Sequence, residues 1–125
     1  MTADKVLETV VGMPLMEFFV KSMPVHKPIC LFGFGADGKQ IYSVMQAKGI
    51  AASCICENNV EVASAETNLK IVSPENAVTM YPDAFFVIGS SKYCYEMALQ
   101  LVKLGIHYEQ LIMYDFMVIC EYHAE

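Results

Sequence analysis

Three glycines in the segment Gly33-Phe34-Gly35-Ala36-Asp37-Gly38 have the spacing Gly-x-Gly-x-x-Gly. Between a buried strand and a helix, such a segment points backbone N–H groups at a phosphate, at the positive end of the helix. In that arrangement Gly33 makes the tight turn, Gly35 admits the phosphate, and Gly38 lets the helix pack closely on the strand. The motif therefore predicts a nucleotide-binding loop formed by residues 33–38.

The same segment also has a purely structural interpretation, because glycine is common where a strand turns into a helix. Phe34 places a bulky ring between the first two glycines. Asp37 places a carboxylate where a pyrophosphate would bind, and that carboxylate can itself satisfy the helix N-terminus. Both interpretations are open at the level of the sequence.

Four further polar residues follow predicted strands. Glu57 and Asn58 come about 20 residues after the motif, at the end of the next predicted strand, where an acidic side chain binds ribose hydroxyls. Ser90 and Ser91 follow another buried strand, and the carboxyl ends of parallel strands meet at one edge of a sheet. We expect these four residues to contribute to the site; a solvated turn at 57–59 and a helix cap at the serines are the structural alternatives.

No catalytic group can be assigned from spacing. The Tyr-x-x-x-Lys pattern, paired carboxylates, a P-loop lysine and zinc-ligand spacings are all missing from the sequence, so whether the protein is an enzyme is left undecided. The five cysteines include no Cys-x-x-Cys pair and the three histidines are scattered, so we expect no metal. We interpret the cysteines as small core residues in a reducing cytoplasm. They are Cys30, Cys54, Cys56, Cys94 and Cys120.

Composition limits the remaining classes of function. A chain of 125 residues that is 55% hydrophobic and 18% charged has room for one well-packed core. The formal net charge of -6 argues against binding to nucleic acid or to an anionic membrane surface. No uninterrupted apolar run of about 18 residues is present, so no membrane span is predicted. We expect a cytoplasmic protein with a small-molecule ligand.

Strand and helix patterns alternate along residues 28–125. Strands are predicted at 29–32, 50–56, 69–72, 84–89 and 110–115, and helices at 36–48, from 73 onward, and at 93–104. This rhythm predicts an α/β fold, a Rossmann-like doubly wound parallel sheet of about five strands in the order 3-2-1-4-5.

Residues 1–27 form a predicted N-terminal helical arm and linker. The apolar residues of the arm exceed what two short helices can bury against each other, so we expect part of the arm to pack against a second copy in a symmetric homodimer. Folding of the arm back onto its own domain is the alternative.

Five segments resemble the Rossmann-like domains of bacterial surface-polysaccharide and sugar-modification proteins. The segments are Phe32 to Gln40, Cys54 to Asn59, Ile71 to Asn76, Ala84 to Tyr93 and Leu104 to Ile106. Such proteins include the nucleotide-sugar-binding N-terminal domains of sugar O-acyltransferases and the corresponding domains of membrane-anchored sugar dehydratases. The resemblance implies a phosphate loop at Gly33, Gly35, Asp37 and Gly38, and a ribose contact at Glu57.

Residues and resemblance together predict binding of a nucleotide, a nucleotide-sugar or a dinucleotide such as NAD. The domain would be accessory to sugar or surface-polysaccharide biosynthesis and would work beside a separate catalytic domain. A first alternative is an NAD-dependent sugar-nucleotide oxidoreductase or epimerase component whose site another chain completes. A second is a degenerate Rossmann module that serves oligomerisation only.

Overall fold

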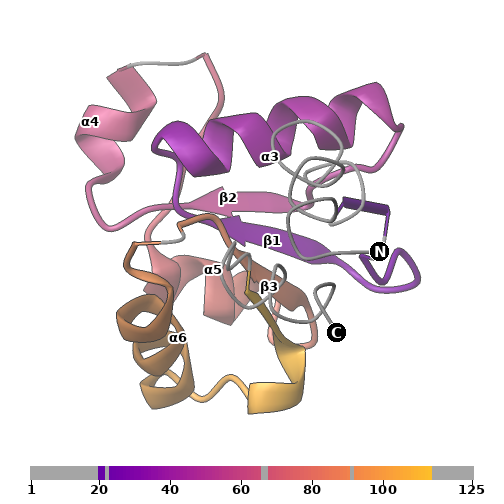
Figure 1. Cartoon of the computed structure of the whole chain (residues 1–125). Coiled ribbons are helices and arrows are strands. Elements are labelled where there is room, and N and C mark those ends of the chain that lie inside the picture. Colours follow the sequence, from indigo (N-terminus) through magenta and orange to yellow (C-terminus); the bar gives the residue numbers. More distant parts are fainter. Residues whose placement is uncertain (1–19, 22, 66–67, 91, 114–125) are drawn as a thin grey trace, which may run out of the picture.

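A parallel β-sheet forms the centre of the structure (Figure 1). The computed structural model describes residues 20–21, 23–65, 68–90 and 92–113. Within these ranges the sheet has four strands: β1 (Ile29–Phe32), β2 (Cys54–Cys56), β3 (Phe85–Ile88) and β4 (Leu111–Met113). Their order across the sheet is β2-β1-β3-β4, and every neighbouring pair is parallel.

The strands are apolar because both faces of the sheet are covered. Successive side chains of a strand point to opposite faces. Accordingly, Ile29 and Leu31 of β1 belong to one buried cluster, whereas Cys30 and Phe32 belong to another. Each of the four is at most 2% exposed, so β1 has no polar position. This explains the continuous apolar run in the sequence.

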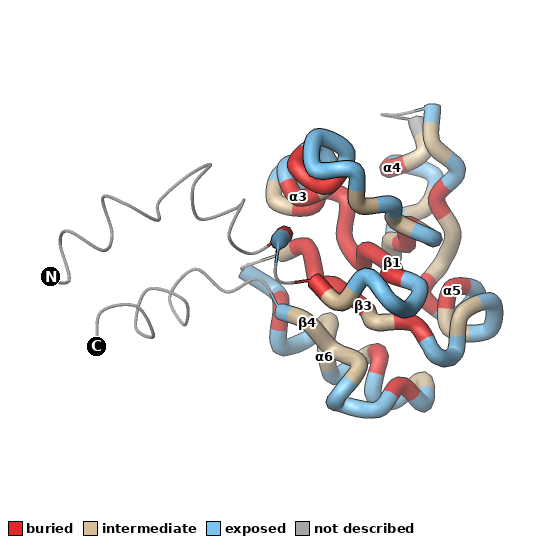
Figure 2. Tube along the Cα trace, turned by 90° about the vertical axis from the view of Figure 1, so that its right-hand side faces the viewer, coloured by how far each residue is buried: buried red, intermediate tan, exposed pale blue. Residues whose placement is uncertain are grey.

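Helices lie on both faces of the sheet (Figure 1). On one face, α3 (Ala36–Ala47) covers the strands, and the short α4 (Val60–Ala65) adds Ala63 to the same buried cluster. On the other face lie α5 (Pro74–Met80) and α6 (Cys94–Lys103). A 3-10 turn, η1 (Tyr108–Gln110), precedes β4. Figure 2 shows buried residues concentrated along β1 and β3, between α3 and α6.

The ends of α3 and α5 follow local sequence signals. Lys48 is the C-cap of α3, and Gly49 takes a φ of 72°, a conformation that terminates helices and favours glycine. At the start of α5 the hydroxyl of Ser73 accepts a hydrogen bond from the Asn76 N–H at 3.2 Å, and Pro74 occupies the first turn. Both predicted helices are confirmed.

The four strands of the sheet keep their predicted relative order, but the edge strand predicted at 69–72 is wrong. Residues 69–72 do not form a strand; they contribute one isolated parallel bridge between Cys56 and Val72, at the outer edge of β2. Two hydrogen bonds make this bridge, from Val72 N–H to the Ile55 carbonyl and from Glu57 N–H to the Val72 carbonyl. The pairing cannot extend further because Pro74 begins α5 two residues later.

Two other elements, β2 and α4, also differ from the prediction. The predicted strand at 50–56 is paired only over Cys54–Cys56, and α4 was not predicted. The six residues of α4 are too few for a recognisable helical period.

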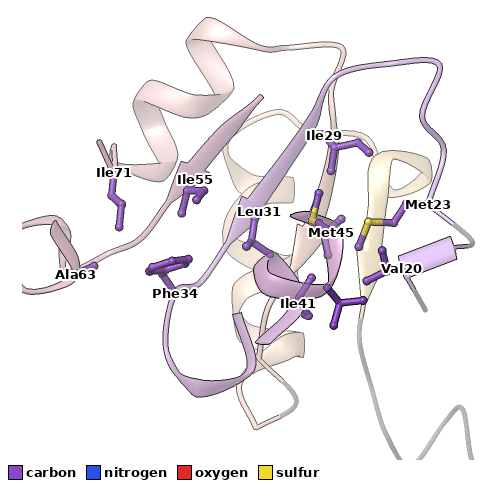
Figure 3. Packing of buried hydrophobic residues seen from close by; sticks show 12 residues of the cluster. Val20, Met23, Ile29, Leu31, Phe34, Ile41, Met45, Ile55, Ala63 and Ile71 are labelled. Carbon is purple, nitrogen blue, oxygen red and sulfur yellow. The ribbon is translucent and has the colours of Figure 1, made fainter. Parts of the chain in front are cut away.

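Most of the predicted N-terminal arm lies outside the described residues. At its described end, Val20 and Met23 are buried in the same cluster as Ile29 and Met45 of this chain (Figure 3). The arm-mediated homodimer stays a prediction. In the described ranges no helix combines the length and the apolar character needed to cross a membrane.

We expect Leu101→Ala to lower the free energy of unfolding by about 2–5 kcal/mol, because truncating a buried leucine leaves a cavity between α6 and the sheet. Leu101 is fully buried, whereas Leu99 on the same helix is 53% exposed, so Leu99→Ala is the matched control. Urea denaturation followed by circular dichroism measures both. Equal losses in the two variants would contradict the packing of α6 described above.

Candidate functional site

A cleft of about 540 Å³ lies at the carboxyl ends of β1, β2 and β3. It is lined by Gly33, Gly35, Ala36, Asp37, Glu57, Asn58, Asn59, Gly89, Ser90, Tyr93, Glu96, Met97 and Gln100. The helices that follow β1 and β3 lie on opposite faces of the sheet, so a crevice opens between the ends of these two neighbouring strands. Open α/β sheets bind their ligands at this position.

Gly33 and Gly38 are required by the fold itself. Gly33 has a φ of 103°, a backbone conformation that residues with a Cβ rarely adopt. A Cβ on Gly38 would overlap the carbonyl oxygen of Gly33, so only glycine lets α3 pack this closely on the end of β1. Gly89 has a similar constraint, because its Cβ would lie 2.9 Å from the same oxygen.

Gly35 is different from these three glycines. Its φ of -80° is accessible to any residue, and a Cβ there would meet nothing within 4 Å among the described residues beyond its own neighbours. It is the N-cap of α3 and has no side chain with which to cap the helix, and Gly35 and Ala36 both line the cleft. Neither packing nor backbone geometry requires glycine at position 35.

The Phe34 side chain does not line the cleft. It is 5% exposed and packs in the cluster that contains Leu31, Ile55 and Ala63 (Figure 3). The bulky ring that separates the first two glycines is therefore directed into the core and leaves the cleft open. Gly38 does not line the cleft either; its place is against the strand.

Glu57 joins the glycine loop to the end of β2. Its Oε2 accepts a hydrogen bond from the Phe34 N–H at 2.8 Å, and its Oε1 accepts one from the Asn58 N–H at 2.9 Å. An ionised carboxylate has about four lone-pair sites, so acceptor capacity for a ligand hydroxyl is left. Glu57 thus has a structural role that the sequence analysis did not predict, and it still lines the cleft.

Asn58 and Gln100 form a reciprocal pair of amide hydrogen bonds. Asn58 Nδ2 donates to Gln100 Oε1 at 3.1 Å, and Gln100 Nε2 donates to Asn58 Oδ1 at 2.8 Å. The pair connects the loop after β2 to α6, and both residues line the cleft. Its amide groups are exposed, so they can exchange these partners for a polar ligand.

The two predicted serines have different outcomes. Ser90 lines the cleft, and its hydroxyl also accepts a hydrogen bond from the Tyr93 N–H at 3.1 Å, one residue before α6 begins. This bond closes a turn ahead of α6, whose N-cap is Tyr93 and has no side-chain cap, so the predicted capping of this helix by Ser90 is not observed. Ser91 lies outside the described residues.

The sequence analysis missed the wall of the cleft that α6 and its N-cap provide. Tyr93, Glu96, Met97 and Gln100 have the spacing i, i+3, i+4, i+7, which places them on one side of a helix. The sequence pattern predicted a helix at 93–104 but no cleft residue on it. The i, i+3, i+4, i+7 spacing of mixed polar and aromatic residues after a strand-ending glycine and serine was the available signal.

The charged groups of the cleft are all negative. Asp37, Glu57 and Glu96 line it, and no lysine does so among the described residues. The sequence contains no arginine at all, since its basic residues are eight lysines. The positive component of the cleft is therefore supplied by the N-terminal ends of α3 and α6, which both lie at the cleft.

The four described cysteines lie outside the cleft. Hydrogen bonding to Cys54 and burial raise the pKa of the Cys30 thiol, and the same hydrogen bond lowers the pKa of Cys54. Burial raises the pKa of the Cys56 thiol. A buried thiol with a raised pKa is a poor nucleophile. Across residues 20–21, 23–65, 68–90 and 92–113, no group of side chains is suited to a metal ion.

A comparison with models of protein families finds no match to the chain, and searches of curated proteins and of solved structures find no match either.

We expect Glu57→Ala to lower the free energy of unfolding by about 1–3 kcal/mol without any ligand, because it leaves the partly buried Phe34 N–H without its charged acceptor. Amide hydrogen exchange at Phe34 should become faster at the same time. Glu61→Ala, an exposed change on α4, is the control and should alter neither quantity. Unchanged exchange at Phe34 in the Glu57 variant would mean that the carboxylate does not hold the loop.

Proposed function

We propose that the cleft binds a ligand of the nucleotide class: a nucleotide, a nucleotide-sugar or a dinucleotide. Gly35 is the observation that carries the proposal. Gly33 and Gly38 are explained by the fold alone, whereas the missing side chain at Gly35 only keeps open the space in front of the N-terminus of α3. A ligand phosphate is the chemical group that needs this space.

The lining residues fit the other parts of such a ligand. Glu57 has acceptor capacity for ribose hydroxyls at the end of β2, the position at which dinucleotide-binding folds hold the ribose. Tyr93 and Met97 offer apolar surface on the α6 wall, and the Asn58–Gln100 pair offers amide donors and acceptors to a base or a sugar. NAD and nucleotide-sugars are both compatible with this set of groups.

The biological setting is proposed from the sequence resemblance alone. It suggests a domain accessory to sugar or surface-polysaccharide biosynthesis, working beside a catalytic domain or completing an NAD-dependent sugar-nucleotide enzyme. The lining residues include no nucleophile paired with a base, which favours binding over catalysis by this chain.

Two glycine variants test the proposal. Asparagine is a preferred N-cap, so Gly35→Asn should keep or raise the stability of α3 while its amide fills the phosphate position. We expect it to weaken ligand binding at least tenfold. Gly38→Ala should instead lower the free energy of unfolding by more than about 1 kcal/mol, because its Cβ overlaps the Gly33 carbonyl.

Isothermal titration calorimetry with NAD, ADP-ribose, UDP-glucose and UDP measures binding, and thermal denaturation measures stability. Binding of any of these ligands that survives Gly35→Asn unchanged would remove the glycine loop from the site. If none of them binds and sedimentation velocity shows a stable oligomer, the oligomerisation module replaces the present proposal.

A further inference from the structure

The cleft combines an opening for phosphate with an unusually poor supply of positive charge. Its three carboxylates come from three different elements: Asp37 from the first turn of α3, Glu57 from the end of β2 and Glu96 from the first turn of α6. Because the elements converge on one crevice, the three carboxylates and Gly35 line the same cleft. The electrostatic potential within a cleft is the sum of the contributions of such charges.

None of the described lysines lines the cleft, although Lys92 lies over the ring of Tyr93, which does. The ammonium group of Lys92 lies 5.2 Å from the centre of the Tyr93 ring, and that of Lys39 lies 5.9 Å from the centre of the Phe34 ring. The N-termini of α3 and α6 each supply a positive charge of only about one half. With no arginine in the sequence, a bidentate clamp on a terminal phosphate is not available from this chain.

We infer that the cleft selects ligands whose phosphates are all diesters and excludes ligands that end in a phosphate monoester; this inference rests on the proposed function. A diester phosphate carries one negative charge at any pH near neutrality. A terminal phosphate has a second pKa of about 6 and carries close to two charges at pH 7. The fixed backbone dipole of α3 can offset the single charge of a diester phosphate. The second charge of a terminal phosphate instead adds to the negative charge of the cleft.

Selection for diester phosphates limits the class of ligands and gives Glu96 a role. Nucleotide-sugars and dinucleotides have only diester phosphates, so they fit; free nucleoside diphosphates and 2′-phosphorylated dinucleotides do not. Glu96 lies on the wall opposite α3, and its carboxylate makes no hydrogen bond or ion pair within the described part of the chain. Its charge acts on the ligand across the cleft, which makes Glu96 a specificity-determining residue.

Matched ligand pairs test this directly by calorimetry on the intact chain. UDP-glucose should bind at least tenfold more tightly than UDP at about pH 7.5. NAD should likewise bind more tightly than ADP or NADP. Near pH 5.5 the terminal phosphate of UDP takes up a proton, so its disadvantage should shrink. The affinity of UDP-glucose over the same pH range corrects for titration of the cleft itself.

A charge change at Glu96 provides the second arm. Glu96→Lys should improve binding of UDP or ADP at least fivefold while changing the affinity for the matching diester ligand much less. Glu109→Lys, which changes an exposed glutamate of η1 outside the cleft, makes the same change in net charge and is the control. An equal gain in both variants would show an effect of net charge alone and would contradict the role of Glu96.

The outcomes separate the two proposals. If UDP or ADP binds as tightly as its diester partner at about pH 7.5, the selection for diesters is wrong while ligand binding at the cleft stands. If neither member of either pair binds, both proposals fail. If the diesters bind more tightly but Gly35→Asn leaves their affinity unchanged, they bind elsewhere and the charge argument does not apply to this cleft.

Discussion

The contact between the backbones of Gly38 and Gly33 is the constraint on which the rest of the structure depends. The first turn of α3 approaches the end of β1 so closely that a single methyl group at Gly38 would overlap the Gly33 carbonyl oxygen. Gly89, at the end of β3, approaches the same oxygen and the Cα of Gly38. Three glycines, from the end of β1, the first turn of α3 and the end of β3, therefore meet where two central strands end, and the close packing of α3 on the sheet follows from them.

This contact also determines where the helix N-terminus points. With α3 held against the ends of β1 and β3, its first N–H groups lie at the crevice between the two halves of the sheet. Glu57 then fixes the loop from the other side, because its carboxylate accepts the Phe34 N–H while the Phe34 ring enters the core. The loop is held by backbone and core contacts, which leaves Gly35 as its exposed point beside the cleft.

The electrostatic character of the cleft follows from the few charged groups that line it. Its positive component comes from the backbone dipoles of α3 and α6, and its charged side chains are carboxylates on three separate elements. Recognition in such a cleft depends on hydrogen bonds to uncharged groups, for which Asn58, Gln100 and Ser90 are suited. Selectivity against excess negative charge is then built into the lining, because removing charge from water costs more when no opposite charge is near.

Sequence alone determined the features that depend on neighbours in the chain. The apolar run at 29–32 indicated a strand buried on both faces, Gly49 marked the end of α3, and Ser73 with Pro74 marked the start of α5. Each signal is local, since it reflects the conformation of a few consecutive residues. The glycine motif and Glu57 were likewise located by spacing, and both lie at the cleft.

Tertiary structure decided the features that depend on distant partners. Residues 69–72 have strand-like composition but reach β2 for only one bridge, because Pro74 turns the chain away. The Phe34 ring takes its direction from the core, and the Phe34 N–H bonds to Glu57, which is 23 positions away in the sequence. Glu96 and Gln100 reach the glycine loop from more than 60 positions away. No local pattern encodes such pairs, because their geometry exists only once α3 and α6 have packed on opposite faces of one sheet.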